Sequence, residues 1–91
     1  MSYLIFSKRH TNGVAMWWRP NASGYTNDVN EAGRYSKIEV ESYCAGTQGD
    51  NIPVDELLVY RDLKVRRIVD MGDSSNYALL MTPNSPLLGN D

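Results

Sequence analysis

Aromatic and basic side chains that could recognise a phosphorylated ring compound gather between residues 17 and 36. Aromatic rings stack on nucleobases, and each such stack contributes about 1–3 kcal/mol in proteins that bind single strands. The planar arginine guanidinium matches two phosphate oxygens, and helix N-termini present free N–H groups to the same anions. We therefore predict a pocket for a small phosphate-bearing ligand such as a nucleotide. Its expected lining residues are Trp17, Trp18, Arg19, Tyr25, Thr26, Arg34, Tyr35 and Ser36.

Core packing is the alternative interpretation of the same rings, because a chain of 91 residues has few other side chains of that size. Neighbouring residues on a strand face opposite sides. One of Trp17 and Trp18 is therefore expected in the core, and the other is left for recognition. Whether Arg19 and Arg34 point into one cavity distinguishes a binding pocket from packing alone.

The remaining reactive residues do not predict catalytic chemistry. His10 is the single histidine and is interpreted as a surface imidazole, while Cys44 is the single cysteine and is interpreted as a small core residue. These counts exclude a disulfide framework and a metal centre built from cysteine and histidine. Asp70 and Asp73 are too few carboxylates for a dedicated cation site. We expect no enzymatic activity, no cofactor and no metal.

The charge is distributed unevenly along the chain. Nine basic and eleven acidic residues give a net charge of −2, but residues 1–27 carry a balance of +3 and the remainder −5. A net acidic chain is a poor general binder of nucleic acid. Direct nucleic-acid binding through Lys8, Arg9 and the tryptophans is therefore only an alternative.

Length and hydropathy predict one small cytoplasmic domain. A chain of 91 residues forms a single modest core. The longest uninterrupted apolar stretch, Val14 to Trp18, is far too short to span a bilayer, and the N-terminus lacks the pattern of a signal peptide. We expect no membrane partner. A symmetric homo-oligomer is left open, since it would bury apolar surface that so small a domain exposes.

A β-hairpin is predicted to hold the two tryptophans. Residues 3–9 and 14–19 are rich in aromatic and β-branched side chains, and Asn12-Gly13 between them is a strong hairpin signal. Pro20 is expected to end the second strand, since it cannot donate to the ladder.

The register of this hairpin follows from the length of its turn. A two-residue turn at Asn12-Gly13 would place Lys8 opposite Trp17 and Ser7 opposite Trp18. The alternation of apolar and polar residues is imperfect in both strands, so the turn alone decides the prediction.

Short helices are predicted after the hairpin. The first is capped by Thr26 or Asn27 and runs through Ala32, with Gly33 as a left-handed residue at its C-terminus. A second follows a capping box at residues 36–39 and ends near residue 44, before Gly46. A third is expected at residues 53–59, because proline suits a first helical position.

Two strands are predicted to complete an α+β domain over residues 1–81. They span Leu63 to Met71 and Tyr77 to Met81, and residues 82–91 form an extended tail. The predicted order is ββ-α-α-α-ββ, with a small antiparallel sheet built from the N-terminal hairpin and the C-terminal strands, packed with two or three short helices.

Three segments together resemble a family of small, mostly uncharacterised proteins of tailed phages and prophages. They are Trp17-Trp18-Arg19-Pro20, Gly24-Tyr25-Thr26 and Ala32-Gly33-Arg34-Tyr35-Ser36, the last followed by Glu39. Residues 52–53 and 67–73 extend the resemblance. It implies an accessory phage protein that acts in the bacterial cytoplasm, where such proteins inhibit or divert host systems, including immune systems.

The resemblance and the predicted pocket together favour one function. It is anti-defence by non-enzymatic sequestration of a small phosphorylated ligand, such as a nucleotide signal of the host. The alternative partner is a host defence protein: the acidic remainder of the chain would then imitate nucleic acid and inhibit a nuclease complex or a polymerase.

Overall fold

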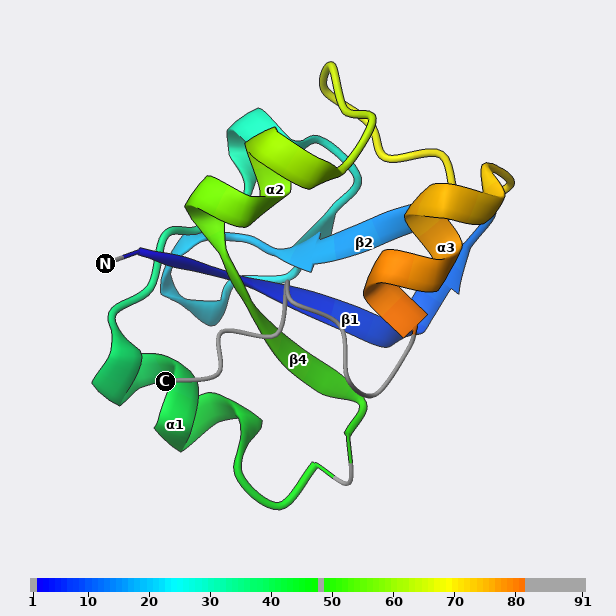
Figure 1. Cartoon of the computed structure of the whole chain (residues 1–91). Helices are drawn as coiled ribbons and strands as arrows, with labels where there is room; N and C mark the ends of the chain where they lie inside the picture. Colours follow the sequence, from blue (N-terminus) through cyan, green and yellow to red (C-terminus); the bar gives the residue numbers. More distant parts are fainter. Residues whose placement is uncertain (1, 48, 82–91) are drawn as a thin grey trace.

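The computed structural model describes residues 2–47 and 49–81, and its centre is an antiparallel sheet of four strands in the order β3-β2-β1-β4 (Figure 1). The strands are β1 (Tyr3–Asn12), β2 (Val14–Trp18), β3 (Tyr25–Thr26) and β4 (Asn51–Asp55). The α-helices of the described residues are α1 (Lys37–Cys44), α2 (Glu56–Asp62) and α3 (Ser74–Met81), and short 3-10 turns span Pro20–Ala22 and Val29–Glu31. The α+β class with an antiparallel sheet is confirmed.

The sheet buries both of its faces, because successive residues of β1 point to opposite sides. Leu4 and Phe6 belong to the larger core, which includes residues of α2 and α3. Tyr3 and Ile5 belong to a smaller core with Val40 of α1. Figure 1 shows α1 on one side of the sheet, with α2 and α3 on the other.

The hairpin forms, but its predicted register is wrong. Trp17 lies opposite Phe6 rather than Lys8, and Ser7 lies opposite Met16 rather than Trp18. The register shifts between Ser7 and Asn12, because β1 contains more residues there than β2. Such an irregularity is a β-bulge, which bends the strand and re-aims its side chains.

Helix α1 is the element that the sequence predicted best. The Ser36 side chain accepts a hydrogen bond from the Glu39 N–H at 3.2 Å, and the Glu39 side chain accepts from the Ser36 N–H at 2.9 Å. This reciprocal capping box starts the helix at Lys37. The chain leaves the helix through Gly46, whose φ of +72° favours glycine.

The predicted first helix is a shorter 3-10 turn that begins later. Asp28 caps it by accepting a hydrogen bond from the Asn30 N–H at 2.9 Å, while Thr26 lies in β3. Gly33 is not left-handed. A Cβ at Gly33 would lie 2.6 Å from the Tyr35 ring, so glycine is needed here for close packing.

The predicted helix at residues 53–59 is wrong in its first half. Residues 51–55 form β4, which pairs with the first half of β1. Helix α2 begins only at Glu56, where the Asp55 side chain accepts a hydrogen bond from the Leu57 N–H at 2.9 Å. Pairing across the sheet therefore overrides the preference of proline for a helix start.

The two predicted C-terminal strands are also wrong. Residues 63–71 form an irregular segment that touches the sheet through isolated bridges, such as Val14 with Asp70. Residues 77–81 lie in helix α3. The observed order of strands and α-helices is β-β-β-α-β-α-α, and the predicted tail at residues 82–91 lies outside the described residues.

Strand β4 is an outer strand of the sheet and carries Pro53 at its centre. Opposite residues of an antiparallel pair of strands alternate between pairs that exchange hydrogen bonds and pairs that do not. The Lys8 N–H donates to the Asp50 carbonyl at 2.8 Å, and this bond shows which pairs of β1 and β4 are of each kind. In that alternation Ile5 and Pro53 are a pair without mutual hydrogen bonds, so an N–H at position 53 would point away from β1. Proline therefore fits the strand without loss of a ladder hydrogen bond.

Candidate functional site

The two tryptophans divide between core and surface layer. Trp17 is 0% exposed in the larger core, and its ring centroid lies 5.6 Å from that of Phe6. Trp18 points to the opposite face, where its ring packs edge-on to Tyr25 and Tyr35. The expected placement of the two rings on opposite faces is confirmed, with Trp17 in the core. Trp18 is half-buried against the smaller core and donates its indole N–H to Asn51, so it is engaged within the fold rather than left open for recognition.

Arg34 is engaged within the fold rather than in a pocket. Its Nη1 donates to the Val29 carbonyl at 2.7 Å and to the Ala32 carbonyl at 2.8 Å. Its Nε donates to Glu56 and its Nη2 to the Tyr60 hydroxyl, each at 2.7 Å. The guanidinium thus joins the 3-10 turn at residues 29–31 to α2.

Tyr35 fixes the loop that follows β2. Its ring is buried, its hydroxyl donates to the Arg19 carbonyl, and the same oxygen accepts from the Ala22 N–H at 3.1 Å. Burial raises the pKa of the Tyr35 phenol above its ordinary value. The Arg19 side chain donates to the Tyr25 carbonyl at 3.1 Å.

Thr26 and Ser36 act in local backbone structure. The buried Thr26 hydroxyl accepts from the Asp28 N–H at 3.1 Å and donates to Glu31 at 3.3 Å, and Ser36 caps α1. The structure therefore does not gather the predicted site residues around one cavity. Tyr25 is the member of that set that lines the cavity described next.

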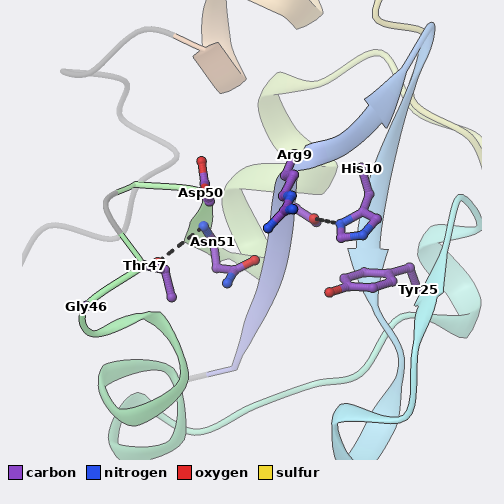
Figure 2. Close-up of a pocket in the computed structure, with 8 residues that line it drawn as sticks. Arg9, His10, Tyr25, Gly46, Thr47, Asp50 and Asn51 are labelled. Atoms are coloured by element: carbon purple, nitrogen blue, oxygen red, sulfur yellow. Dashed lines mark hydrogen bonds between the residues drawn. The ribbon is translucent and has the colours of Figure 1, made fainter.

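A cavity of about 360 Å³ opens on the side of the sheet that carries α1 (Figure 2). Its walls come from β1, from β3 and from the loop that joins α1 to β4. Figure 2 shows this loop on one side and the side chains of β1 and β3 on the other. The lining residues are Ser7, Arg9, His10, Tyr25, Gly46, Thr47, Asp50 and Asn51.

The bulge in β1 places two consecutive residues, Arg9 and His10, at this cavity. The Thr11 hydroxyl holds the bulge, since it donates to the Ser7 carbonyl at 2.7 Å and accepts from the Met16 N–H at 3.1 Å. A regular strand would send neighbouring side chains to opposite faces. The irregular backbone therefore brings a guanidinium and an imidazole to one site.

The His10 ring is held from two directions. Its Nδ1 lies 2.8 Å from the Ser7 hydroxyl, and its face stacks on Tyr25 with centroids 3.9 Å apart and planes inclined by 24°. Ser7 is 0% exposed, so its oxygen orients the imidazole and is not open to a substrate. With Nδ1 engaged, Nε2 is the nitrogen of His10 left for a ligand.

The hydrogen-bond acceptors of the lining side chains are mostly in use. The Asn51 Oδ1 accepts from the Trp18 indole at 3.2 Å, which leaves the Asn51 NH₂ group to face the cavity. The Thr47 hydroxyl donates to the Cys44 carbonyl at 2.8 Å and accepts from the Asn51 N–H at 3.4 Å.

Several donors at the cavity have no partner within residues 2–47 and 49–81. They are the Arg9 guanidinium, the Tyr25 hydroxyl and the Asn51 NH₂ group. The His10 Nε2 is a further polar atom at the cavity, and the tautomer of the ring decides whether it donates or accepts. Asp50 adds one carboxylate to the lining. The site therefore offers a group of donors, one flat aromatic surface and one acceptor.

Cys44 lies at a second, smaller cavity of about 180 Å³ between α1 and β4. Burial raises the pKa of its thiol from 9.0 to about 11. At pH 8 roughly one thiol in a thousand is then a thiolate, about a hundredfold fewer than in the unfolded chain. We expect Cys44 to react with Ellman's reagent about a hundredfold more slowly in the native protein than in guanidinium. Equal reaction rates in the native and the unfolded protein would contradict the raised pKa of the Cys44 thiol.

Within the described ranges, no group of three or more histidine, cysteine, aspartate or glutamate side chains is arranged to hold a metal ion. No α-helix in that part of the chain is both long and apolar enough to cross a membrane. No family model, curated protein or solved structure matches this chain.

Proposed function

We propose that this protein binds a small phosphate-bearing ring compound, such as a nucleotide, in the cavity beside the stacked His10 and Tyr25 rings, and does not transform it. The observation that carries the proposal is the set of donors around one cavity of about 360 Å³ that have no partner in the described part of the chain. This cavity replaces the pocket that the sequence predicted, and Tyr25 is common to both.

Phosphate is the group that such a lining suits best. Its oxygens accept hydrogen bonds, and the Arg9 guanidinium can engage two of them at once. The Asn51 NH₂ group and the Tyr25 hydroxyl would add further donors. Most acceptors of the lining side chains are already in use and Asp50 supplies one more, so the lining is poorly matched to a ligand that presents mainly donors.

A ring is the second part of the proposed ligand. Tyr25 is 38% exposed as a residue although its ring stacks on His10, so part of it remains open beside the donors. A nucleobase in contact with that surface would gain about 1–3 kcal/mol from stacking. Asp50 would accept from an amino group of the base.

The proposed biological role is sequestration of a host nucleotide signal by an accessory phage protein with an anti-defence function. The resemblance at residues 17–36 supports the phage origin, and the cavity supports the ligand class. Sequestration needs affinity and no chemistry. It suits a lining in which the hydroxyl that pairs with an imidazole, that of Ser7 beside His10, is fully buried.

The proposal predicts binding that depends on Arg9. We expect 5′-AMP or 5′-GMP to raise the melting temperature of the protein and to bind at least tenfold more weakly to Arg9→Ala. The matched control is Arg66→Ala, which removes an exposed arginine that does not line the cavity. Both variants change the net charge equally.

Calorimetric titration would measure the affinities, with ribose 5-phosphate as a ligand that lacks the base. We expect ribose 5-phosphate to bind more weakly than either nucleotide. If no nucleotide at millimolar concentration stabilises the protein, the proposed function is wrong. If Arg66→Ala weakens binding as much as Arg9→Ala does, the cavity is not the site.

A further inference from the structure

The polar side chains of Arg9, His10, Tyr25 and Asn51 at the cavity come from three separate strands, and the donors among them lie on all three. Arg9 and His10 lie on β1, Tyr25 begins β3, and Asn51 begins β4. Figure 2 shows the Arg9, Tyr25 and Asn51 side chains extending toward the same space. A group bound there would be approached from several directions at once.

The number of free oxygens separates the possible phosphates. A phosphodiester has two unbridged oxygens and one negative charge. A terminal phosphomonoester has three such oxygens and a charge of about −1.5 to −2 at pH 7. Donors that surround a ligand from three strands can be used fully only by a group that presents acceptors in three directions.

We infer that the site selects a terminal phosphomonoester, as in a nucleoside 5′-monophosphate, over a cyclic or bridging phosphodiester. This inference rests on the proposed function and specifies its ligand class. The phosphate would lie between Arg9 and Asn51, and the Tyr25 hydroxyl would donate to its third oxygen while the Tyr25 ring contacts the base.

Two features of the fold orient part of this lining without a ligand. The Trp18 indole bond fixes which end of the Asn51 amide faces the cavity, and the Ser7 bond together with the Tyr25 ring fixes the His10 imidazole. Side chains that are already oriented lose less conformational entropy when a ligand binds. Asn51 and His10 therefore need no rearrangement to meet a phosphate.

The test compares 5′-AMP with 3′,5′-cyclic AMP, and 5′-GMP with 3′,5′-cyclic GMP, by calorimetric titration of the full chain. These pairs share base and sugar and differ in the phosphate. We expect the monophosphates to bind at least tenfold more tightly, which corresponds to about 1.4 kcal/mol.

Tyr25→Phe isolates the proposed third contact, since it removes only the hydroxyl and keeps the ring that stacks on His10. We expect it to weaken 5′-AMP binding about tenfold and to weaken cyclic AMP binding clearly less. Asn51→Asp keeps an acceptor for the Trp18 indole but puts a carboxylate in place of the NH₂ group. It should weaken the monophosphates more than the cyclic forms.

The titrations separate two questions: whether the protein binds nucleotides, and whether it prefers a terminal phosphomonoester. Equal affinities, or tighter binding of the cyclic nucleotides, would overturn the selectivity and leave the proposed function standing. An equal effect of Tyr25→Phe on 5′-AMP and cyclic AMP would also overturn the selectivity, because the Tyr25 hydroxyl would then not distinguish the two kinds of phosphate. Absence of binding by all four nucleotides would overturn the proposed function together with the inference.

Discussion

Replacing Arg34 by alanine is expected to lower the free energy of unfolding by about 2–4 kcal/mol, although the residue lies at the surface. The guanidinium donates to the Val29 and Ala32 carbonyls, to Glu56 and to the Tyr60 hydroxyl. Alanine would leave both carbonyls without this donor and would release α2 from the turn at residues 29–31. The ion pair with Glu56 adds little to this loss, since both side chains are 28% exposed.

Urea unfolding followed by circular dichroism would measure the effect of Arg34→Ala. Arg61→Ala is the matched control, because Arg61 is more exposed and pairs with its neighbour Asp62. Its expected cost is below about 0.5 kcal/mol. Arg34→Lys should lower the free energy of unfolding nearly as much as Arg34→Ala does. The lysine ammonium cannot donate to all the partners that the planar guanidinium reaches. Equal stability of Arg34→Ala and Arg61→Ala would contradict the role assigned to Arg34.

Replacing Trp17 by alanine is expected to cost about 3–5 kcal/mol, a large share of the stability of a domain this size. Its side chain is fully buried on the face of the sheet that packs against α2 and α3. Alanine would leave a cavity next to Phe6 that the surrounding backbone can fill only in part. Thermal unfolding would report the loss as a large fall in melting temperature.

Two further variants test whether the loss of stability comes from the burial of the Trp17 ring. Trp18→Ala should cost clearly less, because Trp18 is only half-buried. Trp17→Phe should also cost less, because it keeps a ring and removes an indole N–H that has no hydrogen-bond partner within the described residues. If the two alanine variants lost the same stability, the assignment of Trp17 to the core and Trp18 to the surface layer would be wrong.

Features governed by neighbouring residues were predictable from the sequence. The capping box of Ser36 and Glu39 forms as predicted, because both of its hydrogen bonds close within one helical turn. The hairpin also forms, since Gly13 adopts the positive φ that its turn needs. Both signals depend on residues that lie within a few positions of one another in the chain.

Elements decided by distant partners were not predictable. The proline signal at residue 53 favours a helix, but pairing of residues 51–55 with β1 gains a full ladder. The apolar run at residues 63–71 is no regular strand, because it meets the sheet only at isolated points. One of them is the Ala15 N–H bond to the Val69 carbonyl at 3.0 Å, while the Val29 N–H bond to the Arg67 carbonyl at 2.7 Å joins the segment to the 3-10 turn at residues 29–31. Arg67 also donates to Asp28 at 3.0 Å, and this hydrogen bond lowers the pKa of the Asp28 carboxyl.

The candidate site was mostly missed for the same reason. Its donors lie at residues 9–10, 25 and 51, and only the fold brings them together. The bulge that turns Arg9 and His10 to one face has no clear sequence signal beyond Thr11, whose hydroxyl replaces part of the ladder. Tyr25 was found because its ring and its place beside β2 were visible in the local sequence.

Pro53 also limits how copies of this protein could assemble. A strand from a second copy laid along the free side of β4 would find no donor at the centre of that strand. Subunits joined through this edge into one continuous sheet, and fibres that grow by adding strands to it, are therefore disfavoured. The homo-oligomer that the sequence left open would have to form through a surface other than the β4 edge.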